Sequence, residues 1–79
     1  MIKVLFFGPV AERAGCSSLA VEHRPGQRLQ ELRDELAAQY AAAFAIVCFV
    51  AVDGVQVHDL ARPLDDGAEV AFMAKFSGG

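Results

Sequence analysis

The chain has 79 residues, of which 54% are apolar, and a formal net charge of −3. This length gives one small domain with room for one sheet and one main helix, but not for an enclosed active site as well. The sequence has no cluster of Lys and Arg, and such a cluster is typical of proteins that bind nucleic acid or an anionic membrane. We therefore expect partners of neither kind.

The start of the chain and the two cysteines indicate a reducing compartment. The first ten residues contain a short apolar run, but Pro9, Glu12 and Arg13 interrupt it too early for a signal peptide. Cys16 and Cys48 form no CxxC motif and have no further ligands at metal-binding spacing. The sequence predicts a cytoplasmic protein without a disulfide or a bound metal. We expect Cys48 in the core and Cys16 exposed in a turn.

The first third of the chain predicts a strand, a short helix and a second strand. Residues 2–7 are β-branched and aromatic, which favours a strand. Pro9 suits the first turn of a short helix, and Gly15 is placed to cap its C-terminus. Residues 19–23 alternate weakly and predict a strand that pairs with the first, and a turn at residues 24–26 follows.

The middle of the chain predicts one amphipathic helix. Its apolar residues are spaced three, four and four apart, with polar residues between them, as on one face of a helix. The stripe consists of Leu29, Leu32, Leu36 and Tyr40. An alanine run at residues 41–43 extends this helix or frays its end.

The last third predicts three strands joined by tight turns. Residues 46–52 are almost continuously apolar, which favours a buried central strand. Asp53-Gly54 lies between two apolar runs and predicts a type I′ hairpin turn. A second turn at residues 65–67 precedes the last strand at residues 69–76. The fold class is therefore α+β, with a mixed sheet of about five strands, one main helix and a short helix after the first strand.

One main helix covers only one face of such a sheet, so side-chain parity predicts the face that meets a partner. We place four residues beneath the helix: Val4, Phe6, Val70 and Phe72. Leu5, Phe7 and Met73 then share the outer face, where gathered apolar side chains favour a binding surface. The alternative is that a loop covers them, since single exposed apolar residues are common.

Both ends of the chain are similar to one protein family. The sequence opens with MIKVLFF, has Glu12 and Gly15 in AERAG, and closes with RPLDDGAEVAF before a terminal SGG. These stretches resemble the first strand, the short helix and the C-terminal third of the small, sulfur-carrying subunit of molybdopterin synthase. The resemblance implies a ubiquitin-like β-grasp domain at residues 1–76 and a flexible Gly-Gly tail at residues 77–79.

The sequence departs from that family at two places. Many members have Arg directly before the Glu of the short helix, whereas this chain has Ala11 there and Arg at position 13. The family often has a proline pair between the last strand and the tail, where this chain has Ala74 and Lys75. Both departures concern partner contacts and the stiffness of the tail, and neither changes the Gly-Gly end.

The terminal Gly78-Gly79 pair is the feature that carries chemistry. By chance, about one chain in two hundred ends in this way. Glycine has no Cβ, so the pair suits a narrow channel in another protein. The resemblance implies that a ubiquitin-activating-type adenylyltransferase adenylates the Gly79 carboxylate with ATP. A sulfur donor protein then forms a thiocarboxylate, which gives its sulfur to a cyclic pyranopterin phosphate during molybdopterin biosynthesis.

The resemblance implies that the catalytic groups lie on a large partner subunit. We expect this chain to bind no cofactor or metal and to have no activity alone, with Gly79 as the reacting residue and Gly78 giving access. Further residues are expected to contact partners: Leu5, Phe7, Met73, Lys75, Phe76 and Ser77.

Three other functions fit the sequence. One is a sulfur carrier for thiamin, cysteine or tRNA thiolation, and another is a protein modifier that joins Gly79 to a lysine. The third is an interaction module without activation, which alone would keep its function after deletion of Gly78-Gly79. His23 and His58 lack catalytic partners and are predicted as surface strand residues, and Asp65-Asp66 as part of a turn.

Overall fold

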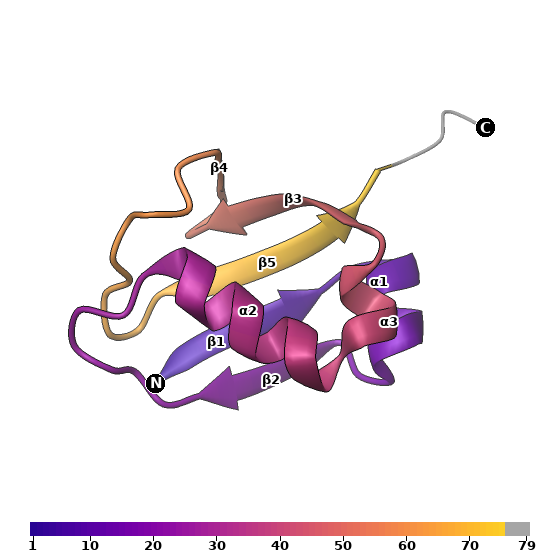
Figure 1. Cartoon of the computed structure of the whole chain (residues 1–79), viewed down its shortest axis with the longest axis horizontal. Helices are drawn as coiled ribbons and strands as arrows, with labels where there is room; N and C mark the ends of the chain where they lie inside the picture. Colours follow the sequence, from indigo (N-terminus) through magenta and orange to yellow (C-terminus); the bar gives the residue numbers. More distant parts are fainter. Residues whose placement is uncertain (76–79) are drawn as a thin grey trace.

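A computed structural model describes residues 1–75 of the chain as one mixed sheet covered by helices. Its elements are β1 (Ile2–Phe6), α1 (Pro9–Ala14), β2 (Ser18–Val21), α2 (Leu29–Gln39), α3 (Ala41–Phe44), β3 (Val47–Val52), β4 (Val55–Val57) and β5 (Glu69–Ala74). The strand order is β2-β1-β5-β3-β4, and the central strands β1 and β5 run parallel. Figure 1 shows α2 across one face of the sheet, with α1 and α3 at one end. The predicted α+β architecture is confirmed.

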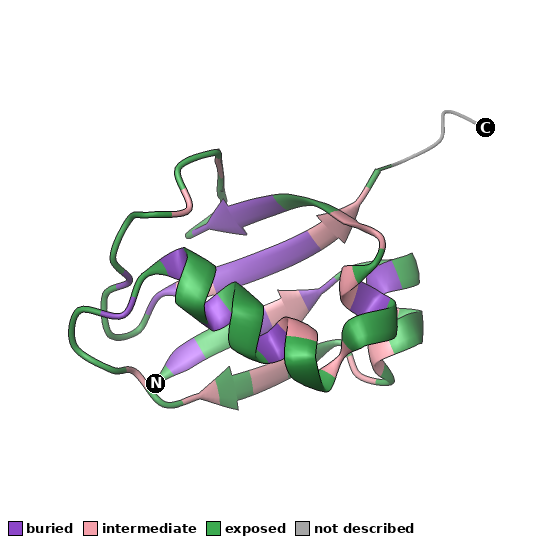
Figure 2. Ribbon diagram, in the orientation of Figure 1, coloured by how far each residue is buried: buried purple, intermediate pink, exposed green. Residues whose placement is uncertain are grey.

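The inner face of the sheet packs against α2 as parity predicts. Each of four strand residues is at most 2% exposed: Val4, Phe6, Val70 and Phe72. The three leucines of the helix stripe are buried as well: Leu29, Leu32 and Leu36. Figure 2 shows this pattern, with the buried positions of α2 facing the sheet and β5 buried along most of its length. Apolar burial of this kind is the main force that holds a small domain together.

The predicted helix cap and the predicted hairpin turn are both confirmed. Gly15 ends α1 with φ 79°, and its N–H donates to the Ala11 carbonyl. Asp53 and Gly54 both have positive φ, at 52° and 83°, as a type I′ turn requires. Asp53 also joins the turn to β5, because its Oδ1 accepts the N–H of Glu69 at 3.0 Å.

Several element ends differ from the sequence prediction. The main helix ends at Gln39, because Tyr40 has φ −125°, and the alanine run begins the separate helix α3. β2 ends at Val21, so His23 lies in the following loop, where its ring N–H donates to the Leu64 carbonyl at 2.9 Å. His58 likewise lies in the loop after β4. Both histidines are therefore loop residues rather than strand residues.

The two cysteines exchange the environments that the sequence predicted. Cys48 is exposed, because β4 pairs only with Val50–Val52 and the register against β5 shifts between Val47 and Phe49. The first half of β3 therefore extends beyond its short neighbour, and Figure 2 shows exposed positions before the buried second half. Cys16 is half-buried and packs against the core instead of being an exposed thiol.

An exposed ion pair joins the start of the chain to the turn before β5. The Met1 ammonium group donates to Asp66 Oδ1 at 2.5 Å, and this hydrogen bond and charge hold the pKa of Asp66 below its usual value. Because the folded state has the lower pKa, the pair stabilises the fold above the ordinary pKa of 3.8. That contribution is lost as the pH falls through the folded pKa. Both groups are largely exposed, so solvent screening keeps the contribution small.

We predict that Asp66→Asn slightly lowers the melting temperature at pH 7. The difference from wild type should shrink below pH 3.8, where the wild-type carboxylate is also protonated. Thermal unfolding followed by circular dichroism between pH 2 and 7 measures this convergence. Asp65→Asn, a neighbour in the same turn, is the control. A gap between wild type and Asp66→Asn that stays constant with pH would contradict the role of the ion pair.

None of the helices within residues 1–75 is long and apolar enough to cross a membrane. The predictions that fall on residues 76–79, namely the domain end, Phe76 and Ser77 as contacts and the Gly78-Gly79 tail, lie outside the described residues.

Candidate functional site

The outer face of the sheet carries an apolar surface on its three central strands. Here Leu5 of β1 pairs with Ala71 of β5, and Ala71 pairs in turn with Ala51 of β3. Phe49 of β3 pairs with Met73 of β5 one step further along. We define the outer patch as Leu5, Phe7, Phe49, Ala51, Ala71 and Met73. The register places all three predicted residues of this face together.

Two aromatic rings dominate the exposed part of the outer patch. Phe7 is 47% exposed and Phe49 is 38% exposed, whereas Leu5 and Met73 are half-buried. Phe7 follows β1 directly, and its N–H donates to the Phe72 carbonyl at 3.3 Å, which places it beside Met73. Phe7 and Phe49 are therefore exposed rather than covered by a loop. Exposed aromatic side chains of this kind are typical of protein interfaces.

Phe49 is the member of the outer patch that sequence analysis missed. The apolar run at residues 46–52 predicts a strand buried on both faces, and such a strand gives no parity signal. The Asp53-Gly54 turn contained the missing signal, because it fixes Val50 and Val52 on the inner face and hence Phe49 and Ala51 on the outer face. Strand parity counted backwards from a hairpin turn would have found this residue.

The C-terminal segment leaves the sheet next to the outer patch. Because β5 runs parallel to β1, its last residue, Ala74, lies at the same end of the sheet as Phe7. On the other side Ala74 pairs with Val47. Lys75 is exposed at this point and lines a surface hollow together with Arg13. The predicted contacts Phe7, Met73 and Lys75 are thus gathered where the chain leaves the fold.

The described residues combine an exposed apolar surface with few neighbouring groups that could hold a metal. Within residues 1–75, no three His, Cys, Asp or Glu side chains gather closely enough to hold a metal ion. The hollow between α2 and β3 is open and lies along the sheet edge, where Phe49 of the outer patch is one of its lining residues. The geometry therefore supports association with another protein as the first requirement of function.

Comparison with known proteins decides the family. Residues 4–79 match the ThiS family, which is nearly the whole chain and includes its last two glycines. This chain belongs to the ThiS family. A comparison with curated protein sequences found no match.

Solved structures with the same fold include both modifiers and converting-factor subunits. Small archaeal modifier protein SAMP1 from Haloferax volcanii superimposes with a TM-score of 0.83 at 20% identity, covering 99% of this chain and 98% of that chain. A putative molybdopterin converting factor subunit 1 from Pyrococcus furiosus gives 0.82 at 22% identity, covering 95% and 97%. Subunit 1 in the complex of subunits 1 and 2 of the molybdopterin-converting factor from Helicobacter pylori gives 0.68 at 25% identity, covering 99% and 97%.

These likenesses confirm the ubiquitin-like β-grasp fold and the resemblance to the small subunit of molybdopterin synthase. They also include archaeal modifier proteins, which share the fold with this ThiS-family chain. The chain therefore has the fold shared by ubiquitin-like sulfur carriers and protein modifiers.

Proposed function

We propose that this chain is a sulfur carrier that works as the small subunit of a molybdopterin synthase. The observation that carries the proposal is the ThiS-family match, which runs through Gly79. The likeness to the Helicobacter pylori subunit, whose structure is a complex with subunit 2, supports the proposal. The chain would act in the cytoplasm with a large catalytic subunit, an activating enzyme and a sulfur donor protein.

The chemistry of the proposal starts at the Gly79 carboxylate. A carboxylate is a poor acyl donor, so the activating enzyme first converts it with ATP to an acyl-adenylate and releases pyrophosphate. A hydrosulfide ion supplied by the sulfur donor protein then attacks the acyl carbon, so that a C–S bond forms as the bond to AMP breaks and AMP leaves. The resulting thiocarboxylate is anionic at neutral pH, and the anion is the reactive form of sulfur nucleophiles. ATP is bound by the activating enzyme and no cofactor by this chain.

The outer patch would bind the large subunit and so direct the tail toward its active site. The patch lies beside the point where the chain leaves β5, so a partner seated on Phe7 and Met73 also receives the C-terminal segment. A tethered nucleophile acts at high local concentration and is not lost by diffusion. Lys75, next to this junction, would contact the same partner.

We predict that Phe7→Ala weakens binding of the large subunit by about ten- to thirtyfold, as loss of an aromatic anchor usually does. The ring is 47% exposed in the free chain and would be buried in the complex. Isothermal titration of the two purified subunits measures the effect. Val55→Ala is the matched control, because Val55 is 66% exposed on β4 outside the outer patch. Equal affinities for Phe7→Ala and wild type would exclude this docking face.

Intact-protein mass spectrometry tests the proposal directly. The chain, purified from its own host, is measured before and after a thiol-selective alkylating reagent, and fragmentation locates the label. A label at Gly79 is the expected result. Cys16 and Cys48 also alkylate, and methionine oxidation mimics the mass gain from oxygen to sulfur, so the position of the label decides. An unmodified Gly79, even with activating enzyme, ATP and a sulfur source, would exclude the carrier function.

The likeness to archaeal modifier proteins favours a second candidate, a ubiquitin-like modifier. Both functions begin with the same acyl-adenylate and differ in the nucleophile that displaces AMP. The same experiment separates them, because a modifier is recovered with Gly79 joined to lysine side chains of other proteins.

A further inference from the structure

The edge of the sheet at the start of β3 has free backbone groups. β4 pairs with Val50–Val52 and ends there, so Val47–Phe49 have no strand on that side within the described part of the chain. An unpaired strand edge offers N–H and C=O groups to another extended chain. The bulge between Val47 and Phe49 leaves this segment exposed, with Cys48 at its centre.

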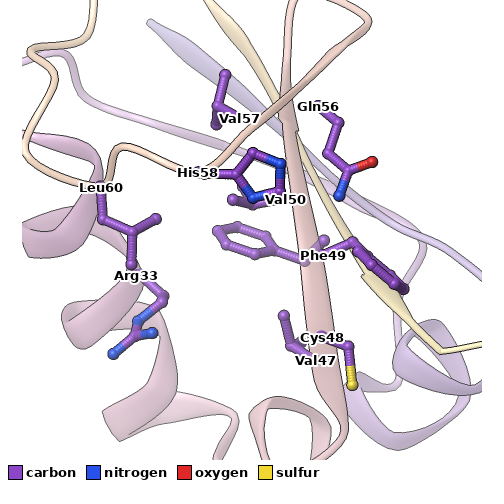
Figure 3. Close-up of a pocket in the computed structure, with 10 residues that line it drawn as sticks. Arg33, Val47, Cys48, Phe49, Val50, Gln56, Val57, His58 and Leu60 are labelled. Atoms are coloured by element: carbon purple, nitrogen blue, oxygen red, sulfur yellow. The ribbon is translucent and has the colours of Figure 1, made fainter.

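A groove runs beside this edge, between β3 and α2. Figure 3 shows Arg33 on the helix side of the groove, Val47 and Val50 on the strand side, and His58 over one end. A second hollow shares Arg33 and Val47 with this groove. A third hollow, around Lys75, shares Cys48 with it. The three hollows therefore adjoin one another along the free edge of β3.

The charges around these three hollows have one sign, whereas a further hollow beyond Val57 and His58 is lined by Asp59, Arg62 and Asp65. The adjoining hollows are lined by three of the seven Lys and Arg residues of the chain: Arg13, Arg33 and Lys75. None of the described residues that line them is Asp or Glu. This arrangement stands out in a chain with a net charge of −3. Arg33 has one acidic neighbour, Asp34 at 3.5 Å, and both side chains are exposed, so this contact is weak.

We propose that the free edge of β3 is a second protein-binding site, which adds an extended acidic segment of a partner as a further strand. The partner's backbone would pair with Val47–Phe49, as in other complexes formed by strand addition. Its carboxylates would meet Arg33 on one side of the edge and Lys75 or Arg13 on the other. The unpaired backbone favours a peptide over a nucleic acid, since only a peptide completes the strand ladder.

This inference does not depend on the chemistry proposed for Gly79. The groove meets the outer patch at the sheet edge, where Phe49 belongs to both surfaces. Binding at the edge requires no ATP, sulfur or terminal glycine. If Gly79 is not loaded with sulfur, peptide binding at the edge of β3 is still expected. If the peptide does not bind, the carrier function of Gly79 is still expected.

The test is a titration of the full chain, labelled with nitrogen-15, with the peptide Val-Glu-Val-Glu-Val-Glu-Val. We expect amide shift changes centred on Val47–Phe49 and the facing turn of α2, and slower hydrogen exchange at the paired amides. A peptide with N-methyl groups on one edge loses strand pairing, and we expect it to bind about tenfold or more weakly. A Val-Lys peptide of the same length should not bind.

Charge-neutralising variants separate the groove from general attraction. Arg33→Gln should weaken binding of the acidic peptide about two- to fivefold, the usual range for an exposed ion pair. Lys3→Gln removes the same charge from the outer face and should leave the affinity within about twofold, since Lys3 lies on β1 away from the groove. Circular dichroism confirms that both variants are folded.

Four results would overturn the proposal. They are no shift changes at millimolar peptide, shift changes centred on the opposite edge at β2, equal binding of the N-methylated peptide, and tighter binding of oligouridylate than of the acidic peptide. The last two would assign the edge to plain electrostatic attraction or to nucleic acid.

Discussion

Removal of Gly78 and Gly79 is expected to abolish thiocarboxylate formation without changing the stability of the fold. The activating enzyme reacts with the terminal carboxylate, and two residues fewer leave it short of that active site. Five residues follow Ala74, the end of β5, and extended they span at most about 16–18 Å. Each lost residue therefore removes about a fifth of the available reach. Mass spectrometry after incubation with activating enzyme, ATP and a sulfur source measures the product.

Single substitution of the last residue gives a finer test of the same idea. Gly79→Ala keeps the length but adds a methyl group beside the reacting carboxylate, and we expect loading to fall about a hundredfold, as misplacement of a reacting group does. Val55→Ala is the control, because Val55 is exposed on β4, outside both the outer patch and the tail. Full loading of the shortened chain would show that the reacting group lies elsewhere. Loss of thermal stability in these variants would show that the tail contributes to the fold.

The replacement Phe72→Ala is expected to destabilise the fold by about 3–5 kcal/mol, which is a large part of the stability of a small domain. Phe72 is fully buried at the centre of β5. Its ring centroid lies 4.8 Å from that of Phe44 and 6.1 Å from that of Phe6. Truncation therefore leaves a cavity beneath α2 and α3 and removes two aromatic contacts. Urea denaturation followed by circular dichroism measures the free energy of unfolding.

Phe7→Ala is the control for this prediction, since it removes the same atoms from a ring that is 47% exposed. We expect it to cost less than about 1 kcal/mol of stability, because much of the ring already contacts water. Comparison of the Phe72→Ala and Phe7→Ala variants then separates the effect on folding from the effect on partner binding. A loss of similar size in both variants would contradict the division of the sheet into a core face and a partner face.

The core and the turns of this fold were predictable from local patterns. Leucine spacing placed the buried side of α2, and the alternation in β1 and β5 placed Val4 and Phe72 beneath it. Asp53-Gly54 fixed a hairpin because a type I′ turn needs two residues that tolerate positive φ. Each of these signals depends on a few neighbouring residues, so the sequence alone carries it.

The incorrect predictions concern features that depend on distant parts of the chain. Cys48 lies in an apolar run, but its exposure depends on the length of β4 and on the bulge opposite β5. Cys16 is half-buried because it packs against a core assembled from the whole chain. The helix break at Tyr40 also depends on a distant residue, since the Tyr40 ring centroid lies 5.6 Å from that of Phe6. The outer patch was only partly predicted, because Phe49 joins it through pairing with Met73.

The parallel pairing of β1 with β5 has a consequence for synthesis of the protein. The two strands come from opposite ends of the sequence, and β5 lies between β1 and β3. A growing chain therefore cannot complete this sheet until β5 has left the ribosome, since β1 and β3 pair with β5 and not with each other. A chain that stops before β5 therefore lacks the strand that joins the two halves of the sheet.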